Sequence, residues 1–156
     1  MIRSHSYSTS LTWTGNQGKG TSNYNSYERS YTISTEGKTD ILGSADPAFR
    51  GDASKYNPEE MLLASLSSCH MLWYLHLCST AGITVTHYED NAEGIMEEHK
   101  NGSGRFTEVI LKPIVKITDE SQIEKAEELH SEANKMCFIA NSCNFPVKHV
   151  AEIKAV

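Results

Sequence analysis

A long apolar segment that begins at Asn57 is the feature that most limits how this chain folds. Asn57-Pro58-Glu59-Glu60 combines a capping residue, a proline at the first helical position and a glutamate three residues after the cap, which is typical of a helix start. The residues that follow are almost all apolar until Gly82, so the pattern predicts a helix of about 23 residues that Gly82 ends. Because the segment is apolar on every side, we expect it to be buried on every side. Its several serines argue against a membrane span.

Short alternating segments on both sides of this helix predict β-strands. A second helix is expected from Asp119, where Asp119-Glu120-Ser121-Gln122 has the form of a capping box, to about Phe138. Helices separated by runs of antiparallel strands indicate an α+β fold, and the 156 residues fit one domain, 1–156. The predicted strands are residues 10–14, 27–35, 40–42, 83–88, 94–99, 106–117 and 145–156.

The charge of the chain excludes some partners. Lys and Arg total 14 and Asp and Glu total 20, which gives a formal net charge of −6. An acidic chain without a basic run has no electrostatic attraction to nucleic acid or to an anionic membrane, so neither is expected as a partner. The residues from Met1 to Tyr7 contain no apolar stretch of a secretory signal, and we therefore expect a cytoplasmic protein.

The cysteines are the strongest candidates for chemistry. Cys69 lies midway along the first predicted helix and Cys137 near the end of the second. Both could be small core residues, since free cysteine is among the most buried residue types. Two thiols on helices that pack together could instead reach disulfide range, about 4.4–6.8 Å between Cα atoms. We expect Cys78 to pack, while Cys143 is an open candidate for a further disulfide partner.

No metal site is expected. No cysteine pair has CxxC spacing, and His70 and His76 do not have the i,i+4 spacing of a chelating pair.

The segment from Asn57 to Cys69, NPEEMLLASLSSC, resembles the signature of the OsmC/Ohr family, the osmotically induced and organic-hydroperoxide-resistance proteins. Residues 137–142, CFIANS, resemble the second-cysteine motif of one OsmC-like subgroup. The resemblance extends from Trp13 through the terminal strand. It implies an OsmC-like fold in which antiparallel sheets wrap around two long central helices of an intertwined homodimer.

The resemblance also implies an activity and assigns residues to it. The chain is expected to reduce organic hydroperoxides to alcohols, with Cys69 as the peroxidatic cysteine and Cys137 as the resolving one. Glu59 matches the family glutamate. Arg50 stands where the OsmC branch places its arginine and is favoured over Arg29, which lies nearer to the Ohr position. No cofactor is expected, and an external dithiol, of the lipoyl type by resemblance, would reduce the Cys69–Cys137 disulfide.

These residue types suit peroxide chemistry. A thiolate, not a thiol, attacks peroxide oxygen, and a guanidinium such as that of Arg50 stabilises the thiolate because it stays charged at physiological pH. Glu59 and Cys69 lie ten residues apart, about 15 Å along a helix, which a glutamate side chain does not span. We therefore expect Arg50 and Glu59 to serve the thiol of a partner subunit, in a composite site. Otherwise they form a surface pair of little energetic value.

Apolar residues near the cysteines predict a pocket for alkyl or fatty-acid hydroperoxides. Each of them is also a plausible core residue. Two alternatives to the enzyme stay open: an OsmC-like protein that binds a small apolar ligand without catalysis, and a thiol redox sensor. The predicted substrate-binding residues are Phe49, Leu66, Trp73 and Phe138.

Overall fold

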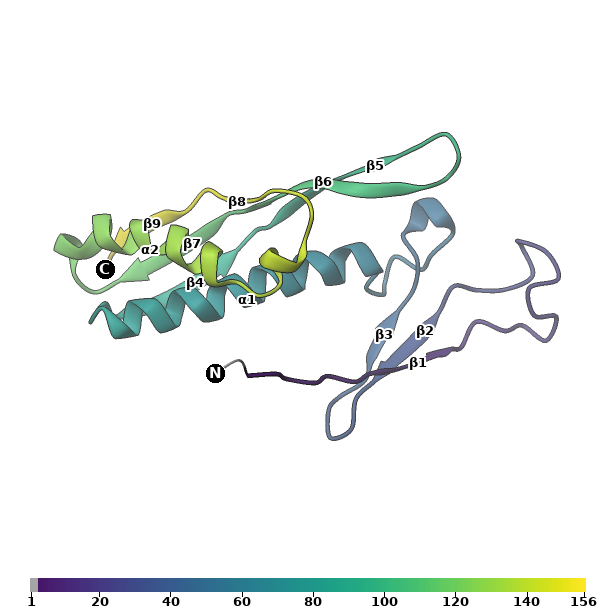
Figure 1. The fold of residues 1–156 in the computed structure, drawn as a ribbon. Helices are drawn as coiled ribbons and strands as arrows, with labels where there is room; N and C mark the ends of the chain where they lie inside the picture. The colour runs from purple at the N-terminus through teal and green to yellow at the C-terminus, as the bar shows by residue number, and fades with distance from the viewer. Residues whose placement is uncertain (1–2) are drawn as a thin grey trace. The chain divides into compact units, whose positions relative to one another are not determined.

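The computed structural model describes residues 3–156, and residues 1 and 2, part of the segment judged to lack a signal sequence, lie outside this range. The chain is α+β, as predicted (Figure 1). It groups into two compact units, one ending at Met61 and one spanning Leu62–Val156. The expectation of a single domain over 1–156 stays a prediction.

The N-terminal unit contains an antiparallel three-stranded sheet in the order β1-β2-β3, with β1 at Ser10–Trp13, β2 at Tyr31–Ser34 and β3 at Ile41–Gly43. The second strand is shorter than expected. Residues 27–30 precede it in a loop that is joined to Asn16 by an isolated bridge at Tyr27. A 3-10 turn, η1 (Pro47–Phe49), follows β3 and leads toward the first helix.

The long helix forms as the sequence predicts. α1 spans Pro58–Thr80, and the cap is reciprocal: Glu60 N–H donates to Asn57 Oδ1 at 2.8 Å, and Asn57 N–H donates to Glu60 Oε2 at 3.2 Å. At the other end Gly82 has φ 73°, which favours glycine, and the next amide donates to the Cys78 carbonyl. Length and composition alone would allow α1 to cross a membrane, a property that core helices of soluble proteins share.

The expectation that α1 is buried on every side is wrong for the single chain. Its buried residues repeat every fourth position, at Leu66, His70, Tyr74 and Cys78, so only one stripe is covered. Leu72, on another face, keeps 64% of its surface exposed. The uncovered apolar surface follows from the all-round apolar pattern and from there being only one layer of partners in the chain.

The C-terminal unit holds two three-stranded sheets, of order β4-β7-β9 and β5-β6-β8. β6 and β7 are separated by Lys112 alone, so one bent stretch of chain serves both sheets. Pro113 is the first residue of β7, a position where a missing N–H is tolerated. The strands are β4 (Val85–Asp90), β5 (Glu93–Glu98), β6 (Gly104–Leu111), β7 (Pro113–Ile117), β8 (Val147–His149) and β9 (Glu152–Ala155).

The end of the chain differs from the prediction of one strand over 145–156. It forms two strands, β8 and β9, which interrupt at Val150 and Ala151 and pair in parallel with β6 and β7. The two sheets of this unit are therefore mixed. The change of sheet at residues 150–151 mirrors the bend between β6 and β7.

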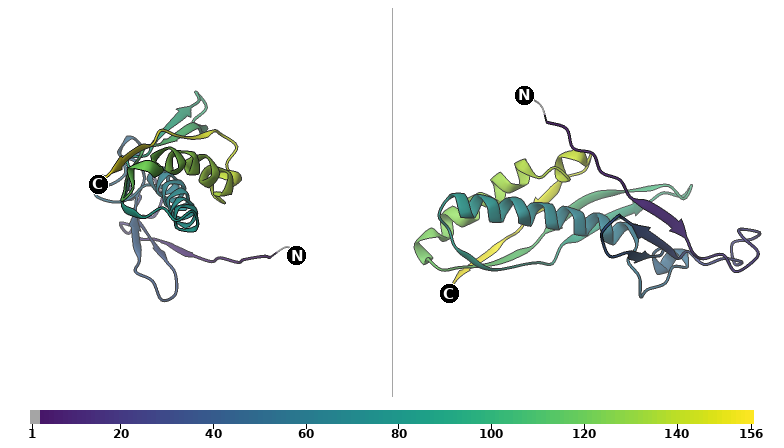
Figure 2. Two further views of the ribbon diagram at one scale, coloured as in Figure 1. Left: turned by 90° about the vertical axis from the view of Figure 1, so that its left-hand side faces the viewer. Right: turned by 90° about the horizontal axis from the view of Figure 1, so that it is seen from below.

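The second helix starts later than predicted. Asp119 Oδ1 accepts from the backbone N–H of Ser121 at 2.9 Å, but this cap holds a 3-10 turn, η2 (Glu120–Gln122). α2 itself spans Ile123–Met136. Its apolar stripe, with Ala126, Leu129 and Ala133 buried, packs in one core cluster with Tyr74 of α1. α1 and α2 lie side by side against the strands of their unit (Figures 1 and 2).

Candidate functional site

The Cys69 thiol lies close enough to that of Cys137 to interact with it. Cys69 lies on α1, half-buried, and Cys137 is the C-cap of α2, only 1% exposed. Both are free thiols. Burial, and then the hydrogen bond with Cys69, raise the pKa of Cys137 to about 11. Cys137 therefore keeps its proton at neutral pH.

The chain around Cys137 fixes its sulfur. Its backbone leaves the helix in an extended conformation, with φ −67° and ψ 110°. The short turn η3 (Ala140–Ser142) then folds back, so that the Ala140 N–H donates to the Cys137 sulfur at 3.4 Å. A backbone amide aimed at the sulfur favours negative charge there, although burial outweighs it in the neutral pair.

The serines around Cys69 have structural roles. Ser68 Oγ donates to the Ser65 carbonyl at 3.2 Å within the helix, and Ser67 Oγ donates to the Asp90 carboxylate of β4. The polar neighbours that made Cys69 stand out in the sequence are thus explained by helix and strand contacts. The case for Cys69 depends on its contact with Cys137.

Trp73 and Phe138 meet beside the thiols. Their rings pack edge to face, with centroids 5.6 Å apart, and Phe138 is 68% exposed. Leu66 is fully buried in a cluster with Val109 and Leu111, so a bound substrate would find none of its surface exposed. Cys78 is packed in the core, as expected. Cys143 donates to the Ile139 carbonyl at 3.3 Å.

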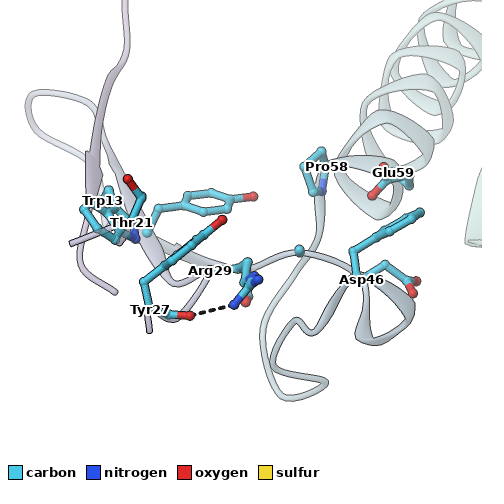
Figure 3. A pocket seen from close by; sticks show the side chains of 11 residues that line it. Trp13, Thr21, Tyr27, Arg29, Asp46, Pro58 and Glu59 are labelled. Carbon is cyan, nitrogen blue, oxygen red and sulfur yellow. Dashed lines mark hydrogen bonds between the residues drawn. The ribbon is translucent and has the colours of Figure 1, made fainter. Parts of the chain in front are cut away.

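The other predicted residues lie in the N-terminal unit, around a pocket of about 410 Å³ (Figure 3). Arg29, Phe49 and Glu59 all line this pocket, whereas Arg50 is not among its lining residues. Its remaining walls are largely aromatic and small: Trp13, Thr21, Tyr27, Tyr31, Ser44, Ala45, Asp46 and Pro58.

Arg29 is held rigidly. Its guanidinium donates to the carbonyls of Tyr27 at 2.6 Å and Tyr24 at 2.7 Å. It also lies 4.2 and 4.3 Å from the centroids of the Tyr24 and Tyr27 rings, each contact being worth about 0.5–1 kcal/mol at such sites. The sequence favoured Arg50 over Arg29 because Arg50 stands where the OsmC branch places its arginine; the tyrosines that flank Arg29 are a local signal for its position.

Arg50 sits at the C-cap of η1 with φ 65° and ψ 30°, a left-handed conformation that is uncommon for a residue with a side chain. The following Gly51 is required by a close approach, since a Cβ there would lie 1.5 Å from the Ala45 carbonyl oxygen. The connector that carries Arg50 is therefore tightly folded.

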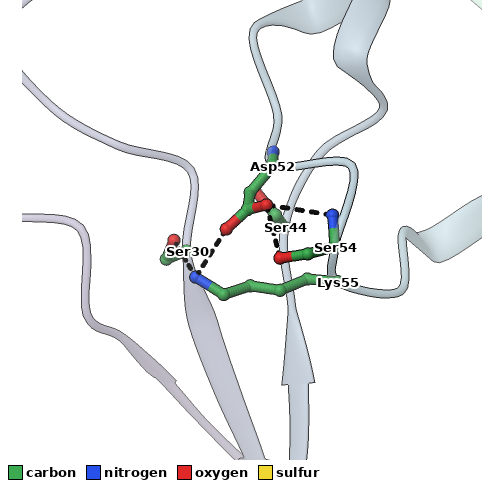
Figure 4. A network of polar contacts seen from close by, with 5 residues as sticks. All are labelled: Ser30, Ser44, Asp52, Ser54 and Lys55. Carbon is green, nitrogen blue, oxygen red and sulfur yellow. Dashed lines mark hydrogen bonds and ion pairs between the residues drawn. The ribbon is translucent and has the colours of Figure 1, made fainter.

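A polar network fastens the same connector (Figure 4). Lys55 pairs with Asp52 at 3.2 Å and donates to Ser30 Oγ at 2.8 Å, while the Asp52 N–H donates to Ser44 Oγ at 3.0 Å. Hydrogen bonds from the Ser54 hydroxyl and backbone, joined by Lys55, lower the pKa of Asp52 to about 2. The network ties residues 52–55 to Ser30 and Ser44, which flank the strands β2 and β3.

Two buried polar atoms of the pocket residues have no hydrogen-bond partner in the described part of the chain. Within residues 3–156, Glu59 Oε2 and the Tyr31 hydroxyl are buried and make no hydrogen bond. Burial, and then the charge of Glu59, raise the pKa of Tyr31, so the phenol stays neutral. The pocket offers a guanidinium, a carboxylate and a phenol among aromatic walls.

Sequence reasoning missed a second cluster in the C-terminal unit. His70 of α1, His130 of α2 and His149 of β8 stack together, with ring centroids 5.3–5.8 Å apart. The signal for His149 was its alternation with Val147, which puts both on the inward face of β8. No cluster suited to a metal ion is found in the described residues 3–156.

Comparison with known proteins gives a consistent result. The family model described as OsmC-like protein matches residues 51–152. An OsmC-like protein of unknown function from Vibrio cholerae is 32% identical, with a TM-score of 0.83, over 97% of this chain and 100% of that one. No curated protein matches the chain.

More distant structures share the fold. An organic hydroperoxide resistance protein from Elizabethkingia anophelis is 17% identical, with a TM-score of 0.66, over 99% of this chain and 100% of that one. One from Legionella pneumophila is 16% identical, with a TM-score of 0.63, over 97% and 99% of the two chains.

Proposed function

Since this chain belongs to the OsmC-like protein family, we propose that it is a thiol-dependent peroxidase that reduces organic hydroperoxides to alcohols. The observation that carries the proposal is the proximity of the Cys69 thiol, midway along α1, to the Cys137 thiol at the end of α2. Two neighbouring cysteines can form a disulfide when their Cα atoms lie about 4.4–6.8 Å apart. Structural relatives that bear the name of organic hydroperoxide resistance proteins support the substrate class.

The proposed reaction uses the two sulfurs one after the other. The Cys69 thiolate attacks the distal peroxide oxygen, the O–O bond breaks, and the alkoxide leaves as alcohol after taking a proton from water. Cys69 is then a sulfenic acid. The Cys137 thiol attacks its sulfur, water leaves, and a disulfide forms. A dithiol reductant, which we propose to be of the lipoyl type, restores both thiols by exchange and is itself oxidised to a disulfide.

We propose that Arg29 supplies the cation for the Cys69 thiolate, with Glu59 orienting it. Arg29 and Glu59 line the same pocket, which supports this choice over Arg50, the residue that the sequence favoured. Arg50 stays the alternative because its strained backbone is typical of functional positions. The ten-residue separation of Glu59 from Cys69 supports a homodimer in which the pocket of one subunit serves the thiols of its partner.

Mixing two inactive variants tests the composite site. Cys69→Ser and Arg29→Ala are each expected to be inactive as homodimers. After the two are unfolded, mixed and refolded together, half the dimers are mixed and each holds one intact site, so about a quarter of wild-type activity returns. Steady-state peroxide consumption measures this recovery.

The matched control mixes Cys69→Ser with Cys137→Ser, which removes two residues of the same thiol pair and should restore no turnover. Absence of recovery in the first mixture, with mixed dimers verified by mass spectrometry, would place each site within one chain. Repeating the mixture with Arg50→Ala decides between the two arginines. The arginine whose replacement by alanine abolishes activity is the one that supplies the cation.

The substrate preference follows from the aromatic surroundings. Phe49 in the pocket, and Trp73 with Phe138 beside the thiols, offer apolar contacts to an alkyl chain. We propose that alkyl or fatty-acid hydroperoxides are better substrates than hydrogen peroxide. The prediction that Leu66 binds substrate is wrong, because Leu66 is completely buried and packs in the core.

The wild-type protein tests the function directly. With reduced lipoamide present, it is expected to consume tert-butyl hydroperoxide over many turnovers, and faster than hydrogen peroxide. Disulfide formation without turnover, with lipoamide or any other dithiol, would indicate a redox sensor. If the thiols are not oxidised and no peroxide is consumed, the protein is a non-catalytic binding protein. The cytoplasmic location stays a prediction.

A further inference from the structure

The proposed peroxidase chemistry does not use the histidine trio of His70, His130 and His149. His70 and His130 are fully buried, and His70 Nε2 lies 2.9 Å from His130 Nδ1 with the rings 3° from coplanar. They join α1 to α2 by a direct side-chain hydrogen bond. His149 of β8 stacks on both, with centroids 5.7 and 5.8 Å away.

The pair accommodates one shared proton. One facing nitrogen must carry N–H and the other must be bare for the bond to exist. A first extra proton places a cation in an apolar core, and a second puts N–H groups on both facing nitrogens and abolishes the bond. Within residues 3–156, His70 Nδ1, His130 Nε2 and His149 Nδ1 are buried without hydrogen-bond partners that would support a charge.

The surroundings are neutral on most sides. From α1, Tyr74 stacks on His130 at 3.8 Å and Cys78 follows one turn later, while Tyr88 of β4 lies behind Tyr74. His149 also lines a pocket of about 500 Å³. The charged groups on these elements include Glu124, Glu127 and Glu128 of α2 in that pocket, Asp90 beside Tyr88, and Lys148 of β8, which pairs with Glu108.

We infer that the histidine trio is a proton-sensitive lock between α1 and α2, which holds the helices together while its rings are neutral and releases α2 as the pH falls. Protons enter from the side of His149, where the glutamates of α2 attract them. Because Cys137 caps the same helix, release of α2 moves its sulfur away from Cys69 and exposes it to solvent.

The direction of the pH dependence follows from burial. Burial, and then the neighbouring histidines, lower the pKa of His70 to about 4 and that of His130 to about 3, whereas a histidine in water has about 6.5. The lock is therefore complete above pH 6.5. As the pH falls from about 6.5 toward 4, the open form takes up protons that the closed form refuses, and the lock is lost.

Hydrogen exchange of the backbone amides measures the lock. After correction for chemical exchange, the protection of residues 123–136 in the wild type is expected to fall at least about tenfold between pH 7 and pH 5, while that of β6 holds. His130→Asn keeps an amide near the position of Nδ1 but does not titrate, so its α2 should stay protected. His76→Asn, on an exposed face of α1, is the control and should behave like the wild type.

Three results would overturn the inference. They are protection of α2 that does not change with pH, an equal loss in all segments, and a loss in His130→Asn as large as in the wild type. If that variant does not fold, nuclear magnetic resonance titration of the wild-type histidine rings decides: His70 and His130 must stay neutral near pH 6 and charge together with the loss of α2 protection. Titration of both near pH 6.5, or stabilisation by added zinc at pH 7, contradicts a proton lock.

Discussion

Replacing Cys69 with serine is expected to abolish hydroperoxide reduction, with turnover reduced at least about a thousandfold, since a serine hydroxyl is not ionised at neutral pH and does not attack peroxide oxygen. The substitution exchanges one sulfur for oxygen at a half-buried position, so the fold should persist. The expected loss thus reports chemistry. Consumption of tert-butyl hydroperoxide with reduced lipoamide is the measurement.

Cys78→Ser is the matched control for this prediction. Cys78 lies on the same helix, nine residues further along, and is buried in the core. It should lower the stability of the protein because a hydroxyl replaces a packed thiol, yet leave the turnover of the folded protein unchanged. Equal rates of peroxide consumption by Cys69→Ser and the wild type would show that the protein is not a Cys69-dependent peroxidase.

Replacing Cys137 with serine should separate the first turnover from those that follow. Without the resolving sulfur, Cys69 is still oxidised by one equivalent of peroxide, but the sulfenic acid persists and the disulfide does not form. Steady-state turnover supported by a dithiol is expected to fall at least about a hundredfold, whereas one alcohol per subunit is still released. Trapping with dimedone, followed by mass spectrometry, should find the adduct on Cys69.

Cys143→Ser serves as the control for this second experiment. The Cys143 thiol donates a hydrogen bond to the Ile139 carbonyl. We expect the variant to release alcohol in the first turnover, and to turn over in the steady state, as the wild type does. If Cys137→Ser keeps full turnover while Cys137→Ser with Cys143→Ser loses it, Cys143 is the resolving thiol. A disulfide found in Cys137→Ser alone would contradict the assignment of Cys137.

Local rules identified the elements whose causes are local. The reciprocal contact of Asn57 with Glu60 and the left-handed Gly82 are fixed by neighbours in the sequence, so both ends of α1 were predicted correctly. Asp119 caps a 3-10 turn in place of a helix, because its contact with Ser121 spans only two residues. Capping residues alone do not distinguish these two outcomes.

Features that depend on distant parts of the chain were less accessible. The meeting of Cys69 and Cys137 was a hypothesis from two helices that must pack; the two thiols lie close enough to interact, and their pairing as a disulfide stays a prediction. The place of Arg29 in the pocket depends on tyrosines that position it, and the convergence of His149 on His70 depends on parallel pairing of β8. The alternation of Val147 and His149 is visible in the sequence, but the strand pairing that brings His149 to His70 is not.

The two parallel pairings share a single offset. Val109 faces Val147 in one sheet and Ile114 faces Glu152 in the other, so partners differ by 38 residues in both. The bent stretch of β6 and β7 can therefore receive β8 and β9 in one closing event during folding, after the nearby β5–β6 hairpin has formed. If the pairing register slipped by one residue, β8 and β9 would be misaligned in both sheets, and the imidazole of His149 would turn to the opposite face. Such a register error is therefore unfavourable in both sheets.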